Sequence, residues 1–424
     1  PVDPGWPLPR ITAYAKRVAA TVAVVDDASA AGVGTALTAA MPALEVLASR
    51  ELTAPAAPGN TRFTRHWMAG PAPAVYLPTS GSTGEPKIVV LSQATLQRSA
   101  ELAVSCFQWR SGERLLNLAE PHTMSGLRNA LVAAPLAGMS WLSSPPAQRR
   151  TLFELLDQIA SLRPHRLVAA PMLLRQINLL GDRLDREALG SLKAVYCTGT
   201  DLDHDEVRCF HARFGLPVLN YYGLTETAGL CVSQSLDDWT PNDRSIGRAV
   251  GCELRVLRAD GATARVDEPG ELQVLQPLPM RGYLDDAAAT AARFDGPWLR
   301  TGDVARIDRH GRTFLVGRSD SFIKSLGTEK IHPREIETVL LRHPSIADAA
   351  ACGLPARGGG ERIAIALVAR SSEAIASDHD LIDWVLQHLG PAFRPSQLEW
   401  VSEIPRGAHG KALRHELARL FDHD

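Results

Sequence analysis

The most informative stretch of this sequence reads Tyr76-Leu77-Pro78-Thr79-Ser80-Gly81-Ser82-Thr83-Gly84-Glu85-Pro86-Lys87. Its two glycines allow a ligand to approach the backbone closely, its four hydroxyls can donate to anionic oxygens, and Lys87 adds a positive charge. A loop of this kind can surround a triphosphate. It is not a Walker A loop, because Pro86 and Ile88 stand where that loop has Gly and Ser or Thr. A polar linker is the alternative, but the apolar run 88–91 that follows at once is typical of a strand.

On the C-terminal side of this loop, apolar runs alternate with amphipathic segments, a pattern that predicts an α/β fold with a largely parallel sheet. We expect strands at 115–118, 167–170 and 192–196 and helices at 151–162 and 205–214. From about 244 to 317, short apolar runs separated by turns predict a small β-rich subdomain.

The two ends of the chain have their own patterns. Residues 11–20 are helix-like and residues 21–25 strand-like, and a Pro- and Gly-rich stretch follows at 54–60. The last hundred residues predict a compact α+β unit, with helices at 335–341 and 381–389 and strands at 346–354 and 362–369. We therefore expect a large N-terminal core of several subdomains at 1–319 and a small C-terminal domain at 320–424.

The composition is that of a soluble globular protein. Hydrophobic residues make up 45% of the 424 and charged residues 22%, which argues against disorder. The net charge of −2 gives no broad positive field, so we expect neither nucleic acid nor a membrane as a partner. The six cysteines include no C-x-x-C pair, which favours reduced thiols and a cytoplasmic location.

Further motifs follow the loop in a fixed order, and together they resemble those of the acyl-adenylate-forming superfamily. That superfamily includes acyl-CoA ligases, luciferases and the adenylation domains of nonribosomal peptide synthetases. The resemblance covers nearly the whole chain, and so many motifs in one order make chance negligible. The matching segments are 1–7 with Arg10, 220–226, 270–272, 280–284, 299–303, 317–324, Gly327 and 405–414.

The resemblance implies a reaction in two halves. A carboxylate attacks the α-phosphate of ATP to give acyl-AMP and pyrophosphate, and a thiol then takes the acyl group. Because two anions approach each other in the first half, catalysis must come mainly from positioning and from positive charge. The phosphate-binding residues implied by the family are Thr79, Ser80, Gly81, Ser82, Thr83, Gly84 and Lys87.

Other nucleotide contacts are implied by the later motifs. Tyr222 would stack on adenine, Thr225 would hydrogen-bond the α-phosphate, and Glu226 would hold Mg²⁺, a cation that prefers carboxylate oxygen. A solvated acid in a loop is the alternative for Glu226. The turn Gly199-Thr200-Asp201 resembles a second adenine contact, although Thr200-Asp201 departs from the commoner Ala-Pro.

The ribose is the expected ligand of a further carboxylate. Asp303 matches the residue that accepts both ribose hydroxyls, which its two oxygens allow. Arg318 would contact ribose or phosphate nearby, with a surface or interdomain salt bridge as the alternative.

The C-terminal domain is expected to act as a mobile lid. Asp320 matches the hinge about which the family's small domain rotates between the half-reactions. Lys411 matches the lysine that bridges carboxylate and α-phosphate oxygens during adenylation, a task suited to a long, flexible ammonium side chain. Gly327 would let a pantetheine arm pass close to the backbone.

The acyl pocket is expected around the run His122-Thr123-Met124-Ser125-Gly126, together with Cys197 and Gly223. Amino-acid-activating relatives usually place an Asp in this run to pair with the substrate ammonium, and this chain has none there. An ammonium buried without a partner is costly, so we expect a carboxylic acid without an α-amino group. The run looks most like that of the o-succinylbenzoate and aryl-acid branch.

Two residues of this region have a second interpretation. His122 takes the aromatic-gate position but could instead be an ordinary packed histidine. Arg128 could pair with a second carboxylate of the substrate, although an arginine on a helix surface is the more common arrangement.

The acceptor thiol is expected to be that of CoA, because the run 330–337 resembles acyl-CoA ligases more than peptide synthetases. The opening Pro1-Val2-Asp3-Pro4 favours the synthetase branch instead, which leaves the phosphopantetheine of a separate carrier protein as the alternative. Transfer to an amine and a non-catalytic nucleotide-binding paralogue are further alternatives. The chain begins inside a family motif and without Met, so we expect it to be N-terminally incomplete or a natural short variant.

Overall fold

The computed structural model describes 2, 6–26, 30–49, 72–79, 87–144, 151–199, 202–318, 323–324, 330–331, 333–356, 361–371, 376–406 and 412–421. Several predicted site residues lie outside these ranges, and their roles stay predictions. They are Ser80, Gly81, Ser82, Thr83, Gly84, Thr200, Asp201, Asp320, Gly327 and Lys411. The Pro- and Gly-rich stretch 54–60 also lies outside them.

The core of the molecule is a seven-stranded sheet with the strand order β11-β10-β9-β8-β7-β5-β6. Strands β5 to β9 are parallel, whereas β10 and β11 are antiparallel additions at one edge. All three strands expected in this region are present within two residues of their expected bounds. The strands are β5 (Arg114–Asn117), β6 (Ser140–Leu142), β7 (Arg166–Ala169), β8 (Ala194–Cys197), β9 (Val218–Tyr222), β10 (Val232–Ser233) and β11 (Arg248–Ala249).

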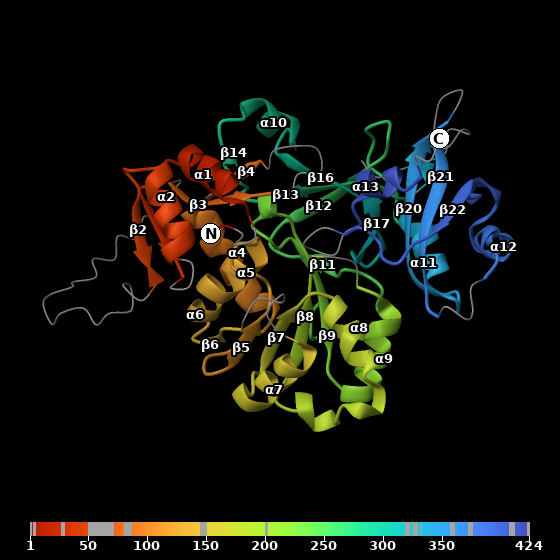
Figure 1. Ribbon diagram of the computed structural model, residues 1–424, viewed down its shortest axis with the longest axis horizontal. Coiled ribbons are helices and arrows are strands. Elements are labelled where there is room, and N and C mark those ends of the chain that lie inside the picture. Colours follow the sequence, from red (N-terminus) through yellow and green to blue (C-terminus); the bar gives the residue numbers. More distant parts are fainter. Residues whose placement is uncertain are drawn as a thin grey trace, which may run out of the picture.

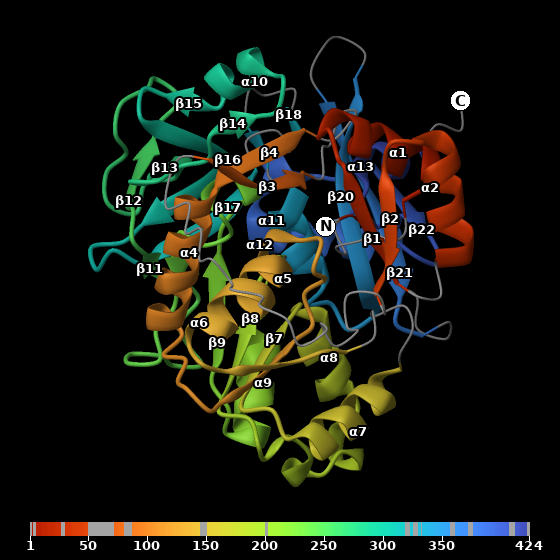
Figure 2. The same ribbon diagram turned by 90° about the vertical axis from the view of Figure 1, so that its left-hand side faces the viewer.

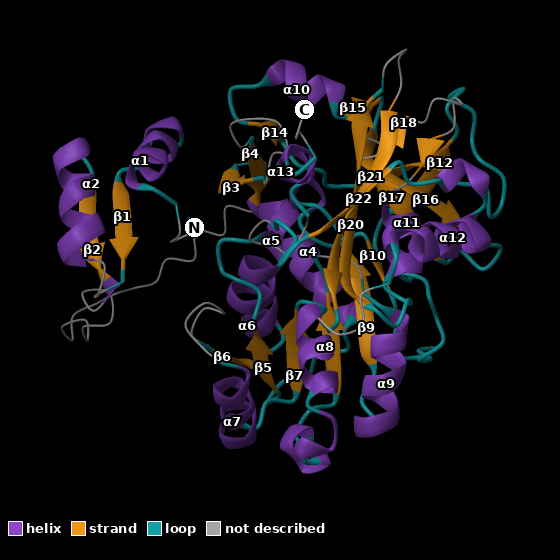
Figure 3. Ribbon diagram, turned by 45° about the vertical axis from the view of Figure 1, so that its right-hand side comes forward, coloured by secondary structure: helices purple, strands orange, loops and turns teal. Residues whose placement is uncertain are grey.

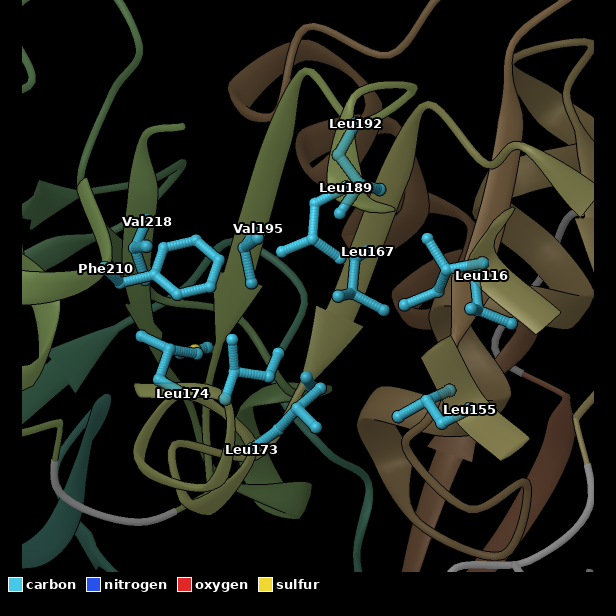
Figure 4. Close-up of a cluster of buried hydrophobic side chains, with 14 of the residues drawn as sticks. Leu116, Leu155, Leu167, Leu173, Leu174, Leu189, Leu192, Val195, Phe210 and Val218 are labelled. Carbon is cyan, nitrogen blue, oxygen red and sulfur yellow. The ribbon is translucent and has the colours of Figure 1, made fainter. Parts of the chain in front are cut away.

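Three helices cover one face of this sheet: α7 (Leu152–Leu162), α8 (Met172–Leu179) and α9 (His204–Phe214). Leu and Val side chains of neighbouring strands meet those of the helices in a continuous apolar cluster (Figure 4). Local sequence sets the helix ends. Thr151 and Glu154 form a capping box at the start of α7, and Gly215 ends α9 with a φ of 69°.

The other face carries α4 (Gln93–Cys106), α5 (Met124–Gly126), the π-helical segment η2 (Leu127–Ala133) and α6 (Ala134–Leu136). Its buried cluster contains the aromatic rings of Phe107, Tyr196 and Tyr221. A π-helix widens the turn, and such segments are frequent at functional sites. The run in which the acyl pocket is expected therefore lies on the same face of the sheet as the aromatic cluster.

Two smaller sheets lie at one end of the seven-stranded sheet (Figures 1 and 2). One is three-stranded with the order β14-β4-β3, and the other is an antiparallel sheet with the order β12-β13-β16-β15 in which β17 pairs with β16. The second confirms the expected β-rich subdomain. The strands are β3 (Pro73–Pro78), β4 (Ile88–Ser92), β12 (Glu253–Leu257), β13 (Gly270–Leu275), β14 (Gly282–Tyr283), β15 (Phe294–Asp295), β16 (Trp298–Ile307) and β17 (Thr313–Arg318).

The C-terminal unit is a three-stranded sheet, β20-β21-β22, packed against three helices (Figure 1). Its contact with the core includes a hydrogen bond of 2.8 Å from Arg175 of α8 to the Ala347 carbonyl. The elements are β18 (Ile323–Lys324), β19 (Lys330–Ile331), α11 (Pro333–Leu340), β20 (Ile346–Pro355), β21 (Glu361–Ala369), α12 (Asp378–Leu389), β22 (Gln397–Trp400) and α13 (Arg414–Arg419). The predicted fold class, a large α/β core with a smaller α+β domain, is confirmed.

The N-terminal unit lies at the side of the core (Figure 3). It consists of α1 (Leu8–Arg17), β1 (Val22–Val25), η1 (Ala30–Gly34), α2 (Thr35–Ala40) and β2 (Glu45–Ala48). Helix α1 begins three residues before the expected Ile11, because Pro9 is tolerated in a first turn. The hydroxyl of Tyr14 donates to the Tyr76 carbonyl over 2.7 Å and ties this unit to β3. Among the described residues, no helix is long and apolar enough to cross a membrane.

Candidate functional site

The glycine-rich loop connects two paired strands. Strands β3 and β4 are antiparallel, with Pro78 opposite Ile88, and the loop joins their ends. The backbone N–H and the hydroxyl of Thr79 both donate to the Lys87 carbonyl, over 2.8 and 3.2 Å. The two described ends of the loop are therefore held together, although Ser80–Gly84 lie outside the described residues.

Lys87 lies near Tyr283, which hydrogen-bonds the predicted metal ligand Glu226. Its ammonium nitrogen is 5.1 Å from the centroid of the Tyr283 ring, on β14, which pairs with β4. The Tyr283 hydroxyl donates to Glu226 Oε1 over 2.7 Å. Burial and the charge of Glu226 raise the pKa of Tyr283, so its hydroxyl keeps the proton that it donates.

Glu226 is a buried carboxylate, only 7% exposed, in the short turn η6 (Thr225–Thr227) after β9. The Thr227 hydroxyl bonds the backbone of Leu224 and closes this turn. Besides Tyr283, Arg293 approaches Glu226 Oε1 at 3.3 Å. Both contacts use the same oxygen of Glu226. Because the side chain is buried and bonded to Tyr283 and Arg293, Glu226 is not a solvated loop acid.

The donor set around Glu226 fits Mg²⁺. The described residues contain no cluster of three or more His, Cys, Asp or Glu side chains that could hold a metal ion by themselves. Mg²⁺ suits such a site, because it is usually bound by one or two carboxylates together with substrate phosphates and water. Glu226 Oε2, which has no hydrogen-bond partner in the described part of the chain, is the oxygen best placed to bind it.

Asp303 forms a second polar centre near the end of β9. The Tyr222 hydroxyl donates to its Oδ2 over 2.5 Å, and Arg318 Nη1 lies 3.4 Å from its Oδ1. The backbone N–H of Asp303 binds the Thr301 hydroxyl over 3.0 Å. Burial and the charge of Asp303 raise the pKa of Tyr222 well above its ordinary value. Two planar carboxylate oxygens are thus held in a fixed orientation.

The two carboxylates belong to one network. Arg293 contacts Glu226 on one side and donates to the Thr301 carbonyl over 3.3 Å on the other. Thr301 in turn binds the backbone of Asp303. The structure therefore brings together, from four separate motifs, the predicted residues Thr79, Lys87, Tyr222, Thr225, Glu226, Asp303 and Arg318.

The predicted acyl-pocket run forms a tight turn followed by a helix. Thr123 caps α5: its hydroxyl donates to the Glu120 carbonyl and accepts from the Gly126 N–H. Gly126 is required, since a Cβ there would lie 2.0 Å from the Glu120 carbonyl oxygen. Met124 packs into the apolar cluster that contains Leu77 and Tyr283. The run thus lies against the sheet that carries the glycine-rich loop, with His122 partly exposed.

Gly223 packs against the backbone that leads away from Glu226. A Cβ on Gly223 would lie 2.4 Å from the Gly229 carbonyl carbon and from the Leu230 nitrogen. A Cβ on Gly229, whose φ is +82°, would lie 2.8 Å from Met124 Cγ and 3.4 Å from Arg128 Nη1. Because neither glycine has a side chain, only backbone lies between the nucleotide motif at Gly223 and the side chains of Met124 and Arg128.

Arg128 and Cys197 lie in surroundings that the sequence did not predict. Arg128 is not on a helix surface: its side chain is fully buried, at 0% exposure. Helix packing against the aromatic cluster, which single-sequence periodicity does not reveal, explains the difference. Cys197 is buried among the Leu and Val side chains on the α7–α9 face of the sheet, whereas Tyr221 points to the other face. The role of Cys197 in the acyl pocket stays a prediction. Gly199, two residues later, has a φ of +93°.

Sequence reasoning missed one residue of the network and underrated another. Arg293 stands at the end of α10 (Ala287–Ala292) without any motif of its own, and only the fold brings it to Glu226. Tyr283 belongs to the matched segment 280–284, but its hydrogen bond to a residue 57 positions away has no local signal.

Two family models match the chain. The model of the AMP-binding enzyme matches residues 1–284, and that of the AMP-binding enzyme C-terminal domain matches residues 335–411. The sulfoacetate–CoA ligase of Cupriavidus necator is 32% identical over 348 residues, which are 82% of this chain and 67% of that protein. The indoleacetate–CoA ligase of Aromatoleum aromaticum is 29% identical over 349 residues, 81% of this chain and 66% of that protein. The chain thus spans about two thirds of the length of these curated relatives.

The fold also matches solved structures. The o-succinylbenzoate CoA synthetase of Bacillus subtilis, in complex with its acyl-adenylate intermediate, superimposes with a TM-score of 0.81 at 24% identity. The match covers 97% of this chain and 81% of that chain. At this identity the likeness concerns the fold.

Proposed function

The chain belongs to the AMP-binding enzyme family, and on that premise we propose that it is an AMP-forming acid–thiol ligase. It activates a carboxylic acid without an α-amino group, of the aryl or acyl type, and transfers the acyl group to CoA. The observation that carries this proposal is the network in which Lys87, Glu226 and Asp303 are held at one end of the parallel sheet.

The first half-reaction joins the acid to AMP. A carboxylate oxygen attacks the α-phosphorus of ATP, and the bond from that phosphorus to pyrophosphate breaks. Asp303 orients the ribose, Tyr222 lies against the base, and Thr225 and Lys87 offer a hydroxyl and a positive charge to the phosphates. Mg²⁺ bound at Glu226 supplies positive charge that offsets the phosphate oxygens.

The second half-reaction moves the acyl group to sulfur. The CoA thiolate attacks the acyl carbon, and AMP leaves with the bonding pair. We propose that the domains divide near Asp320, that rotation there exchanges the Lys411 loop for the thiol path, and that Gly327 borders this path. The phosphopantetheine of a carrier protein is the alternative acceptor.

The choice of acid follows from the residues around Thr123. An amino acid would bring its ammonium group to this turn, where the described run 122–126 has no Asp to pair with it and offers hydroxyl, thioether and imidazole groups. Burying an unpaired ammonium costs several kcal/mol, so the pocket selects against amino acids (roughly 3–5 kcal/mol when a buried pair lacks one partner).

Acid-dependent exchange of pyrophosphate into ATP tests the proposal. We expect exchange with aryl, succinylaryl or medium-chain acids and none with amino acids, and a thioester product when CoA is added. Exchange with amino acids alone would overturn the pocket assignment. Loss of all exchange across the panel would instead indicate a non-catalytic nucleotide-binding paralogue. Carrier protein or amine supplied in place of CoA, with the product mass measured, distinguishes the acceptors.

The role of Lys411 is tested by separating the half-reactions. We expect Lys411→Ala to abolish adenylation while it spares thioester formation from supplied acyl-AMP. Lys16→Ala, a change of an exposed lysine on α1, is the matched control and should leave both unchanged. Equal loss of the two half-reactions in Lys411→Ala would contradict this role.

A further inference from the structure

Arg128 is a fully buried cation whose hydrogen-bond partners among the described residues, Asn129 and Tyr221, are neutral. Its Nε and Nη2 donate to the Asn129 carboxamide oxygen over 3.0 and 2.8 Å, and this acceptor is neutral. Its Nη1 has no hydrogen-bond partner in the described part of the chain. A guanidinium stays charged in proteins, so a full positive charge is buried here. At least one of its N–H donors, on Nη1, has no acceptor among the described residues.

No acidic side chain among the described residues compensates this charge. The groups that interact with it most strongly are Tyr221 and Cys106, and burial raises the pKa of both, so both are neutral at pH 7. The rings of Tyr221 and Phe107 lie 5.5 and 6.0 Å from the guanidinium carbon. Cation–π contacts of this length recover only part of the cost of burying an ion.

The unpartnered nitrogen lies close to a residue that also borders the predicted acyl-pocket run. It lies next to Gly229, where a Cβ would come within 3.4 Å of it, and the backbone of Gly229 in turn borders Gly223. Met124, of the acyl-pocket run, is the other neighbour of Gly229. Arg128 itself lies two residues after that run, in the π-helical segment η2.

The surrounding polar groups hold the guanidinium in this orientation. Ser125 and Tyr221 share a short hydrogen bond between their hydroxyls, and the Asn129 amide donates to the Tyr221 hydroxyl over 3.2 Å. The Asn129 carboxamide oxygen is thereby fixed to accept from Nε and Nη2. Among the residues that the structure describes, Nη1 is left without an acceptor.

We propose that Arg128 determines substrate specificity by binding a second anionic group, a carboxylate or sulfonate, at the far end of the acid that is activated. The proposal rests on the proposed function and narrows its substrate class to acids with two anionic groups. Arginine suits this task because its planar fork matches a carboxylate or sulfonate. Among the acids in the relatives' names, sulfoacetate has two anionic groups and indoleacetate has one. The names therefore do not decide the substrate class, and the proposal rests on Arg128.

The test compares acids that differ only in the second anion. One pair is 2-succinylbenzoate and 4-oxo-4-phenylbutanoate, which lacks the ring carboxylate, and another is glutarate and its monoamide. In pyrophosphate exchange, we expect the wild type to prefer the dianionic member of at least one pair by tenfold or more in kcat/KM. Arg128→Met should reduce that preference to within about twofold, mainly through KM for the dianion.

Two further variants separate this role from a structural one. Arg128→Lys keeps the charge and should keep part of the preference, whereas Arg98→Met, a change on the exposed side of α4, should keep all of it. A merely structural Arg128 would lower kcat/KM for both members of a pair alike.

The outcomes distinguish this proposal from the one on which it rests. Exchange with single-anion acids only, or an equal loss for both members of each pair in Arg128→Met, overturns the assignment of Arg128 and leaves the ligase function standing. Absence of exchange with every carboxylic acid overturns both. A preference that falls in Arg128→Met and partly returns in Arg128→Lys supports both.

Discussion

Two buried arginines border the same aromatic cluster and differ in what they bind. Arg166, on β7, donates to both carboxylate oxygens of Glu113 over 2.8 and 3.1 Å and to the Tyr196 hydroxyl over 3.1 Å. Arg128 lies over the Tyr221 ring with a carboxamide as its hydrogen-bond acceptor. They are 5% and 0% exposed, so burial does not explain the difference.

The difference separates a structural from a ligand-binding arginine. A buried ion pair that is fully hydrogen-bonded is complete within the protein, and removing one partner leaves the other charged and alone. A buried cation without an acid gains its counter-ion only when a ligand brings one. Arg166 is of the first kind and Arg128 of the second.

The largest effect should come from breaking the complete pair. We expect Arg166→Met to destabilise the fold by about 3–5 kcal/mol, because the remaining charged partner of buried Glu113 in the described part of the chain is then Lys193, which is largely exposed. The urea midpoint, followed by tryptophan fluorescence, measures this loss. Arg208→Met, which removes an exposed ion pair with Asp205, is the control and should change the midpoint little. A loss for Arg166→Met as small as the control's would contradict the distinction.

Acid titration sharpens the same contrast. Burial raises the pKa of Glu113, but the hydrogen bonds and charges of Arg166 and Lys193 outweigh it and lower the pKa from 4.5 to about 2. A carboxyl whose pKa is lower in the folded state stabilises the fold above its unfolded pKa, and this contribution disappears as the pH falls from about 4.5 to 2. It amounts to about 3 kcal/mol. Glu113→Gln should flatten the dependence of the urea midpoint on pH in this window, and an unchanged slope would refute the assignment.

A third arginine lies between these two kinds. Arg293 has an acidic partner, Glu226, but that partner is also the predicted Mg²⁺ ligand. If Arg293 orients the carboxylate, Arg293→Gln should raise the Mg²⁺ concentration needed for tight binding of a non-hydrolysable ATP analogue by about tenfold. Calorimetry at several Mg²⁺ concentrations measures this without turnover. Arg300→Gln, which changes a partly exposed pair with Glu271, serves as the control. Equal Mg²⁺ requirements in wild type and Arg293→Gln would show that Arg293 is only a structural partner.

The smallest effect on stability should come from Arg128. Arg128→Met leaves no acid unpaired, and only the buried Asn129 carboxamide oxygen loses its donors. The free energy of unfolding, measured from the urea midpoint, should therefore fall by about 1–3 kcal/mol, less than for Arg166→Met. A loss as large as that of Arg166→Met would place Arg128 among the structural arginines.

Sequence alone predicted the parts of this molecule that depend on local pattern. The apolar runs of β5, β7 and β8 and the glycine-rich loop between β3 and β4 are visible without the fold. The motif residues Glu226 and Asp303 were predicted from their resemblance to a family. Their shared network was not, because it joins residues far apart in the chain.

Long-range packing accounts for what the sequence did not reveal. Arg293 reaches Glu226 across 67 positions, and Tyr222 reaches Asp303 across 81. The burial of Arg128 depends on a π-helical turn packed under an aromatic cluster, whereas a regular helical period leaves its environment undecided. Local sequence therefore indicated which residues to consider, and tertiary contacts decided what they bind.

A double-mutant cycle for binding tests the central claim most directly. Calorimetry would measure the affinity of 2-succinylbenzoate and of 4-oxo-4-phenylbutanoate for wild type and for Arg128→Met, in the presence of a non-hydrolysable ATP analogue and Mg²⁺. If the ring carboxylate is the counter-ion of Arg128, the coupling free energy between the two should be about 1.5–3 kcal/mol. A coupling within about 0.5 kcal/mol of zero would show that Arg128 does not meet the second anion of this acid.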